Sequence, residues 1–126
     1  MDALILQTAA SGAPVTAVAG TFALFALFLS LTAHIAVRNV LGDVELKKAF
    51  AVGPVPAAIA VVFTTFGWNS FVALALAIGL DFTLVKYLYG RSNRLSAYVV
   101  FIHFVVTVIL GFVLFGLLVI LTSAPL

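Results

Sequence analysis

Residues 70–90, SFVALALAIGLDFTLVKYLYG, form an apolar run that is long enough to cross a lipid bilayer as a helix. Asn69 or Ser70 can cap the start of this helix, and Gly90 can end it. The middle of the run carries one acid, Asp81, and a carboxylate in hydrocarbon is costly unless it has a partner or a purpose. The fold therefore depends on which other helices surround this one and on what meets Asp81.

The whole chain has the composition of an integral membrane protein. Of its 126 residues, 65% are hydrophobic and 8% are charged, and the mean hydropathy is +1.34, whereas about a quarter of a soluble domain is charged. The absence of cysteine excludes disulfides, thiolate metal sites and cysteine catalysis. The first residues lack the basic region of a signal peptide, so we expect no cleaved leader. We predict a single membrane domain over residues 1–126.

Four apolar segments can cross the membrane. They predict spans at 15–37, 44–66, 70–89 and 96–121, arranged as an all-α antiparallel bundle of four transmembrane helices. The second span contains Pro54 and Pro56, each of which removes a backbone donor, so we expect a kink there. The alternative is a short re-entrant helix, which is tolerable only where protein or water covers the broken backbone. The kinked helix is the preferred interpretation.

The basic residues are confined to two links between spans. All six Lys and Arg side chains lie in or beside residues 38–48 and 86–94, whereas the turn at 67–70 and both ends of the chain carry none. Short loops rich in Lys and Arg stay in the cytoplasm. We therefore predict a multi-pass protein of the cell (plasma) membrane, with both termini outside and the basic loops 38–48 and 90–95 cytoplasmic.

Helix geometry places two ionisable residues at one depth. Asp81 lies eight residues before Tyr89, and His103 lies seven residues after Ser96, so both are about 11–12 Å from the link between the third and fourth spans. Helices joined by a short link are antiparallel neighbours, so the two side chains can meet. Such a pair either pins two helices together or exchanges protons along a transport path. Pinning is the preferred interpretation, and Thr107 could extend the polar stripe.

The first span offers a second polar group and a packing face. Ser30, His34 and Arg38 share one side, where they could line a vestibule or bind a lipid head group. The simpler alternative, an interfacial His beside an anchoring Arg, is preferred. Phe25 and Leu29 lie on the opposite side, which suits lipid or a partner. Small residues that let helices approach closely, within one chain or between copies, occur at Ala19, Ala23, Ala26, Ala75 and Gly79.

The run LTAHIAVRNVLGDVELKKAFAVGPVPA, residues 31–57, resembles the corresponding stretch of small four-span membrane proteins of halophilic archaea. The fourth span shares this likeness. That family has no assigned function, so the resemblance implies a prokaryotic cell membrane and nothing about catalysis.

The motifs that are absent limit the function. The sequence contains no HExxH, GxSxG or P-loop motif, so we expect no enzyme and no cofactor. The two His and one Asp come from different spans at unequal depths, so we expect no metal site. No nucleic-acid motif is present. A chain this small favours self-association or a larger membrane partner. The preferred hypothesis is an accessory or structural subunit of a membrane assembly; the alternative is a homo-oligomeric channel or proton-coupled transporter that uses Asp81 and His103.

Overall fold

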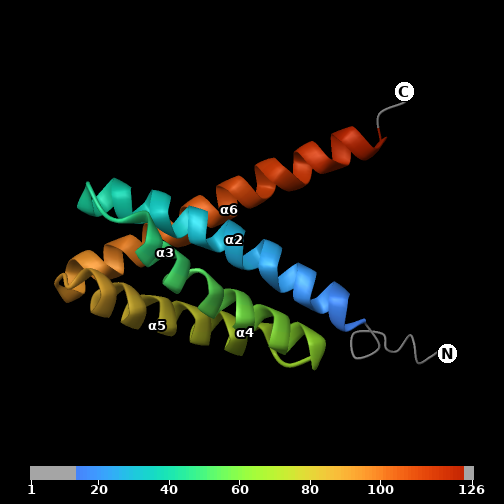
Figure 1. Ribbon diagram of the computed structural model, residues 1–126, viewed down its shortest axis with the longest axis horizontal. Helices are drawn as coiled ribbons and strands as arrows, with labels where there is room; N and C mark the ends of the chain where they lie inside the picture. Colours follow the sequence, from blue (N-terminus) through green and yellow to red (C-terminus); the bar gives the residue numbers. More distant parts are fainter. Residues whose placement is uncertain (1–13, 124–126) are drawn as a thin grey trace.

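The helices of the computed structural model, which describes residues 14–123, run lengthwise in a bundle with no strand in that range (Figure 1). Four segments are long and apolar enough to cross a membrane: α2, the combined α3 and α4, α5 and α6. The predicted all-α bundle of four transmembrane helices is thereby confirmed. The helix bounds are α2 (Val15–Leu41), α3 (Leu46–Val52), α4 (Pro54–Thr65), α5 (Ser70–Tyr89) and α6 (Asn93–Ser123).

The ends of α5 follow from local chemistry. The Asn69 side chain accepts hydrogen bonds from the backbone N–H groups of Phe71 at 2.8 Å and Val72 at 3.3 Å. These donors would otherwise lack a partner in the first turn of the helix. At the other end Gly90 has φ +63°, a left-handed conformation that favours glycine, and its N–H bonds to the Lys86 carbonyl. The sequence therefore defines both ends of the helix that carries Asp81.

The second span bends at Gly53, between α3 and α4. Pro54 and Pro56 have no N–H to offer the carbonyls of Phe50 and Val52, so the helical ladder is interrupted there. Gly53 keeps helical angles (φ −59°, ψ −43°), and its own N–H bonds to the Ala49 carbonyl at 2.9 Å. The bend is consequently modest, and α4 continues the course of α3 (Figure 1). The structure shows the kinked helix and not the re-entrant alternative.

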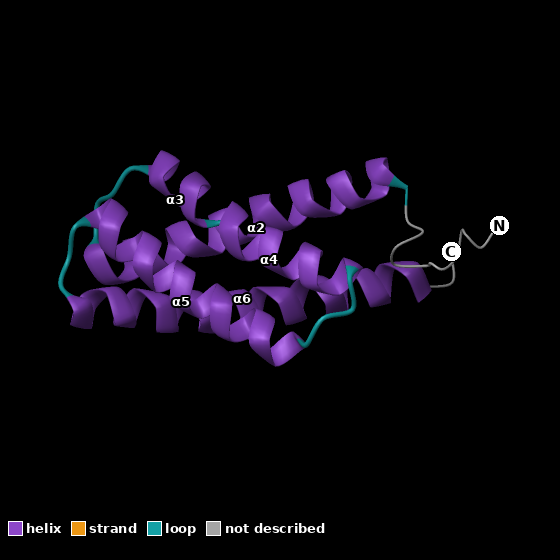
Figure 2. Ribbon diagram, turned by 90° about the horizontal axis from the view of Figure 1, so that it is seen from below, coloured by secondary structure: helices purple, strands orange, loops and turns teal. Residues whose placement is uncertain are grey.

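The four spans form a ring. α2 contacts α4 and α6, and α5 contacts the same two helices, whereas the diagonal pairs do not approach one another within residues 14–123. The links 42–45 and 90–92 lie together at one end of the ring, which we call the link end (Figure 2). The 66–69 turn, the start of α2 and the end of α6 lie at the opposite end, the turn end.

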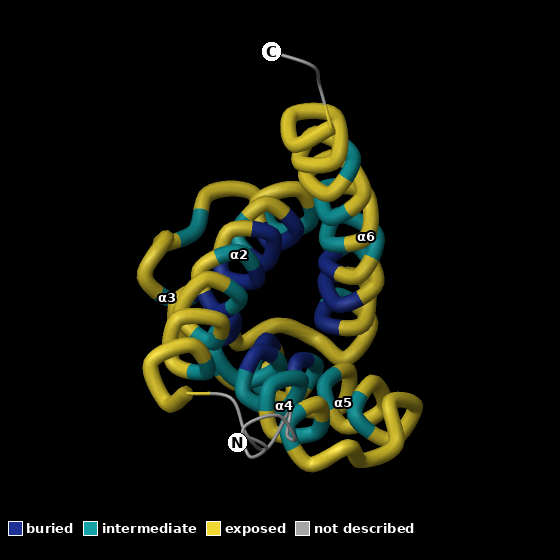
Figure 3. Tube along the Cα trace, turned by 90° about the vertical axis from the view of Figure 1, so that its right-hand side faces the viewer, coloured by how far each residue is buried: buried dark blue, intermediate teal, exposed yellow. Residues whose placement is uncertain are grey.

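The half of the ring near the link end is closely packed. Figure 3 shows that the buried positions of α2 and α6 lie on the sides of these two neighbouring helices that face each other. Small and β-branched side chains fill this half, which lets the four backbones approach closely. The cluster consists of Ala33, Ala36, Val37, Ala49, Val52, Val85, Tyr89 and Val99.

Toward the turn end the core is smaller and joins α2 to α4. Ala26, Leu29 and Ala57 are its buried members, with Phe25 packed against them. Leu29 is only 6% exposed, so of the two surroundings expected for this side of α2, lipid or a partner, Leu29 has a partner, which is the next span of the same chain. The reason is that α4 covers this side of α2, and the sequence cannot show which helix covers a given apolar face.

The positions of the small residues differ in burial. Ala26 is buried, but Ala19 and Ala23 on α2 and Ala75 and Gly79 on α5 are exposed. A Cβ placed on Gly79 would meet no atom within 4 Å. These four positions therefore do not bring two helices of this chain together and are free for contacts between chains.

The last turns of α6 extend away from the other helices (Figure 1). Residues 112–115 and 117–123 are all exposed. Since these residues cover every side of the helix, this part of α6 has no protein neighbour within the described chain.

Candidate functional site

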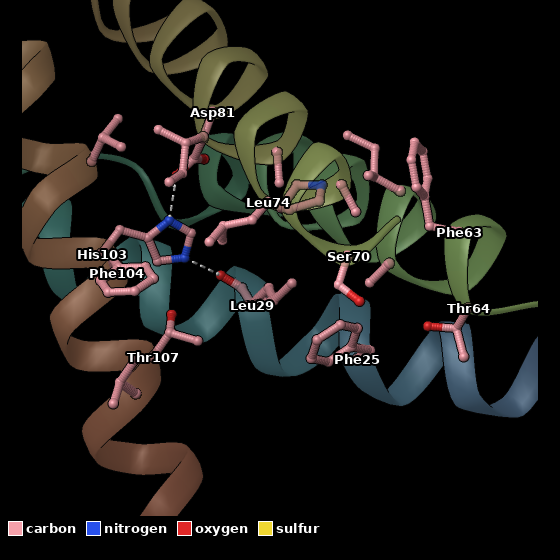
Figure 4. A pocket seen from close by; sticks show the side chains of 18 of the residues that line it. Phe25, Leu29, Phe63, Thr64, Ser70, Leu74, Asp81, His103, Phe104 and Thr107 are labelled. Atoms are coloured by element: carbon pink, nitrogen blue, oxygen red, sulfur yellow. Dashed lines mark hydrogen bonds and ion pairs between the residues drawn. The ribbon is translucent and has the colours of Figure 1, made fainter. Parts of the chain in front are cut away.

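Asp81 and His103 meet in the middle of the ring (Figure 4). The Asp81 Oδ2 and His103 Nδ1 atoms are 2.6 Å apart. The two residues are 5% and 4% exposed, so only a small part of either side chain is accessible. The two helices that carry them, α5 and α6, are joined by the short link 90–92 and run antiparallel, which brings the two side chains to the same depth.

The other ring nitrogen of His103 faces α2. His103 Nε2 lies 3.2 Å from the Leu29 carbonyl oxygen and 3.0 Å from Thr32 Oγ1. A carbonyl oxygen can only accept, so the Leu29 contact is a hydrogen bond in the states of His103 in which Nε2 carries a hydrogen. The Thr32 hydroxyl donates to the Leu29 carbonyl at 3.1 Å and accepts from the Thr107 hydroxyl at 3.0 Å. This network joins α2, α5 and α6.

The network links the hydrogen on Nε2 to the number of protons that the pair holds. When Nε2 donates to the Leu29 carbonyl, a hydrogen bond between Nδ1 and Oδ2 needs a second proton. That proton can reside on the imidazole, which gives an imidazolium–carboxylate ion pair, or on the carboxyl group, which gives two neutral groups. In either arrangement the Asp81–His103 pair has no net charge, as a low-dielectric environment requires.

A cavity of about 540 Å³ extends from the turn end to this pair. Asp81 and His103 line its inner end, and the exposed residues Thr64, Trp68 and Ser70 line it at the turn end. Exposed residues also line it on the facing parts of α5 (Leu74, Ile78) and α6 (Phe104, Val108). No Lys or Arg is among the lining residues. Its walls are largely apolar and aromatic and include Phe25, Ile59, Phe63, Leu74, Ala77, Phe104 and Val108.

Further buried polar atoms continue from the pair toward the link end. Asp81 Oδ1, His34 Nδ1, Tyr89 Oη and Ser96 Oγ have no hydrogen-bond partner among the described residues. Tyr89 and Ser96 lie on the same helices as Asp81 and His103, about 11–12 Å nearer the link end. Buried polar groups normally have partners, and ordered water is the usual one where protein groups are lacking.

The structure does not bring Ser30, His34 and Arg38 together as a vestibule. Ser30 is 1% exposed and packs against Gly53. Arg38 instead points outward, and its Nη1 lies 3.4 Å from Asp43 Oδ1, with both side chains well exposed. His34 lies between them at intermediate burial. The three residues share a helix face, but that face is buried at Ser30, half-buried at His34 and exposed at Arg38.

Thr32 and the Leu29 carbonyl are the two members of the site that the sequence analysis missed. Both belong to α2, which lies more than 70 residues from His103 in the chain. The one available signal was that Thr32 lies two residues from His34, in a polar section of an otherwise apolar span. That section indicated a polar face but not its partner.

Comparison with known proteins identifies a family, but the function of that family is unknown. No curated protein and no solved structure is significantly similar to this chain. A family of unknown function, DUF7473, matches residues 12–125, which is nearly the whole chain. This agrees with the resemblance to proteins of unassigned function, although it says nothing about archaea or halophiles. The chain is therefore a member of the DUF7473 family.

Proposed function

We propose that this protein is a small proton-coupled transporter in which the Asp81–His103 pair is the proton site. The observation that carries the proposal is the 2.6 Å contact between Asp81 Oδ2 and His103 Nδ1 at the inner end of a cavity that opens at the turn end. Ionisable residues inside membrane spans mark ion and proton pathways, and histidine exchanges protons near neutral pH.

The location of the pair suits transport better than pinning alone. A pair that only joined α5 to α6 would be equally effective inside the packed half of the ring, within the core cluster. Instead both side chains line the cavity. A proton or substrate that comes from the turn end can therefore reach them.

The link side of the pair supports a continuing route. His34, Tyr89 and Ser96 each have a buried polar atom without a partner among the described residues. Hydroxyl and imidazole groups can pass protons along a chain of hydrogen bonds when water molecules connect them. We propose that protons pass between Asp81–His103 and the link end along these groups.

Proton flux into liposomes tests the proposal. Protein reconstituted with a trapped pH-sensitive dye should dissipate a pH gradient when the co-transported solute is supplied on one side, and Asp81→Asn should abolish this flux while retaining a hydrogen bond to His103. Asp43→Asn makes the same chemical change at a side chain that is 97% exposed and should leave the flux intact. Equal flux for the wild type and Asp81→Asn, with both variants eluting as the same folded particle, would overturn the proposal.

A second candidate, an accessory or structural subunit, is supported by α6. The exposed circumference of residues 112–123 and the exposed Ala75 and Gly79 are surfaces where another copy or a larger membrane protein could pack. The mass and composition of the particle extracted gently from its native membrane separate the two ideas. Other subunits would favour the accessory role, and copies of this chain alone would favour a homo-oligomeric transporter.

We also propose the orientation and setting of the protein from the sequence. The basic loops 38–48 and 90–95 are placed in the cytoplasm, so the mouth of the cavity faces outward. The resemblance of residues 31–57 suggests the cell membrane of a halophilic archaeon. In this proposal the protein has no enzymatic activity.

A further inference from the structure

We infer that the substrate of this site is a hydrophobic organic cation with an N–H donor, such as a primary ammonium with an aromatic body, taken up in exchange for one proton. This inference rests on the proposed transport function and names the substrate class of the same cavity. Three properties of the site support it: its proton count, the chemistry of its walls and the charges that it lacks.

The proton count favours exchange. The Asp81–His103 pair is neutral when one proton lies between Nδ1 and Oδ2. If a monovalent cation enters while that proton stays, the buried site acquires a net positive charge, which is costly in hydrocarbon. If the proton leaves to water through the cavity, an anionic Asp81 faces a neutral His103 and the bound cation, and the site remains neutral. One cation in and one proton out balances the charge.

Asp81 has the acceptor capacity that an ammonium group needs. A carboxylate can accept about four hydrogen bonds, and the described residues offer Asp81 only the one from His103. When the shared proton leaves, the ammonium N–H can take its place as donor to the carboxylate. Charge-assisted bonds of this kind are shorter and stronger than bonds between neutral groups.

The walls of the cavity fit an apolar body. Phe25, Phe63, Trp68 and Phe104 contribute aromatic rings to the lining. Aromatic faces attract cations through their quadrupole and also bury hydrocarbon. A volume of about 540 Å³ lies within the usual range of small-molecule sites, about 300–1,000 Å³.

The same lining disfavours other ligands. Anions would find no Lys or Arg in the cavity. An inorganic cation such as Ca²⁺ needs about six or more oxygen ligands to replace its water shell, and residues 14–123 contain no group of three or more His, Cys, Asp or Glu side chains that could hold a metal ion. An organic cation gives up less hydration and gains apolar contacts.

The polar and titratable groups that surround the Asp81–His103 pair determine how the exchange depends on pH. α2 contributes the Thr32 hydroxyl, the Leu29 carbonyl and, nearer the link end, His34; α4 contributes no titratable side chain to the cavity. α5 contributes Asp81 and Tyr89, and α6 contributes His103. The short α3 carries Lys48, whose Nζ lies 5.5 Å from the centre of the Tyr89 ring and which does not line the cavity. Protonation of the Asp81–His103 pair therefore competes directly with the cation.

The single tryptophan of the chain makes binding measurable. Trp68 lines the mouth of the cavity, and no other tryptophan contributes to the fluorescence. With the full-length protein in lipid nanodiscs, 2-phenylethylammonium should change the Trp68 emission saturably. The neutral 2-phenylethanol and the anionic 3-phenylpropionate have the same aromatic body and should bind far more weakly. Equal affinity for the neutral alcohol would overturn the inference.

Two pairs of variants locate the binding site. Asp81→Asn should weaken ammonium binding by at least about thirtyfold, as expected when one partner of a buried charge pair is lost, whereas Asp43→Asn should not. Ala77→Phe places a ring inside the cavity and should block binding, whereas Ala75→Phe adds the same ring to an exposed position of α5 outside the lining. The second pair keeps the test decisive if Asp81→Asn fails to fold. Undiminished binding in Ala77→Phe would contradict the proposed location.

Proton release completes the test and separates it from the transport proposal. In weakly buffered solution each bound ammonium should release one proton, and its affinity should rise about tenfold per pH unit while the amine stays protonated. Binding without proton flux in liposomes that carry a 2-phenylethylammonium gradient would retain the substrate class and reject transport. Proton flux without ammonium binding would retain transport and reject this substrate class.

Discussion

Gly53 lies directly against Ser30, so that a Cβ placed on Gly53 would come within 2.6 Å of the Ser30 Cα and even closer to its backbone nitrogen and Oγ. This contact joins the bend of the second span to the middle of α2, beside the residues that hold His103. No change in the Ser30 side-chain rotamer can relieve a clash with its backbone. The distance between the two helices therefore depends on the absence of a side chain at Gly53.

Gly53→Ala should destabilise the fold. The added methyl group must displace the α2 backbone, and overpacking of this kind costs about 1–3 kcal/mol. Thermal or denaturant unfolding of the purified protein measures the effect. Gly79→Ala is the control, because its Cβ meets nothing within 4 Å, and Ala in place of Gly in a helix is favourable by up to about 1 kcal/mol. Equal stability for the two variants would show that α2 and the bend at Gly53 are farther apart than they are in the structure.

Thr32→Val should loosen the hydrogen bonds around His103. Valine has the shape of threonine but cannot accept from His103 Nε2 or from the Thr107 hydroxyl, and a bond between membrane helices is worth about 0.6–2 kcal/mol. We expect a loss of stability in that range together with lower proton flux. Thr83→Val is the matched control, since among residues 14–123 the exposed Thr83 hydroxyl bonds only to the Gly79 carbonyl of its own helix. A Thr32→Val protein with unchanged stability and flux would contradict this part of the network.

Tyr89→Phe separates stability from transport. The buried Tyr89 hydroxyl has no partner among the described residues, so its removal should leave stability unchanged or raise it by up to about 1–2 kcal/mol. Proton flux should fall, because the hydroxyl lies on the proposed route to the link end. Tyr87→Phe removes a hydroxyl from an 82% exposed side chain of the same helix and should alter neither property. A Tyr89→Phe protein with normal flux would remove Tyr89 from the route.

The orientation can be tested without background labelling, because the chain has no cysteine. Phe66→Cys places a thiol at the turn end, and Glu45→Cys places one at the link end, both at exposed positions. In intact cells a membrane-impermeant maleimide should label the first variant, and it should label the second only after the membrane is permeabilised. The reverse pattern would place the cavity mouth toward the cytoplasm.

The sequence predicted the helices well because their signals are local. Long apolar runs, the caps at Asn69 and Gly90, and the two prolines of the second span depend only on neighbouring residues. The depth argument also brought Asp81 and His103 to one level, since rise per residue and a short link fix the relative depth of two adjacent helices.

The neighbours of each helix face were not predictable in the same way. In lipid both the outer and the inner side of a helix are apolar, so the pattern of hydrophobic residues does not distinguish them. Leu29 was therefore assigned to a face suited to lipid or to a partner, with no indication that α4 covers it, and Thr32 was not recognised as a partner of His103. Conversely Ala75 and Gly79 have the spacing of a packing face and yet lie exposed.

The half of the ring near the turn end contains the cavity (the hollow half), and the half near the link end contains the core cluster (the filled half). This division determines across which part of the protein the membrane voltage drops. Water that fills the cavity would conduct the potential of the turn-end side down to Asp81 and His103, whereas the cluster around Val37, Val52 and Val85 is closely packed and would sustain the field. An elementary charge that crosses the entire potential gains or loses about 2.3 kcal/mol per 100 mV. Loading from the cavity is thus expected to be nearly insensitive to voltage, and most of the electrical work falls on the short passage through the filled half.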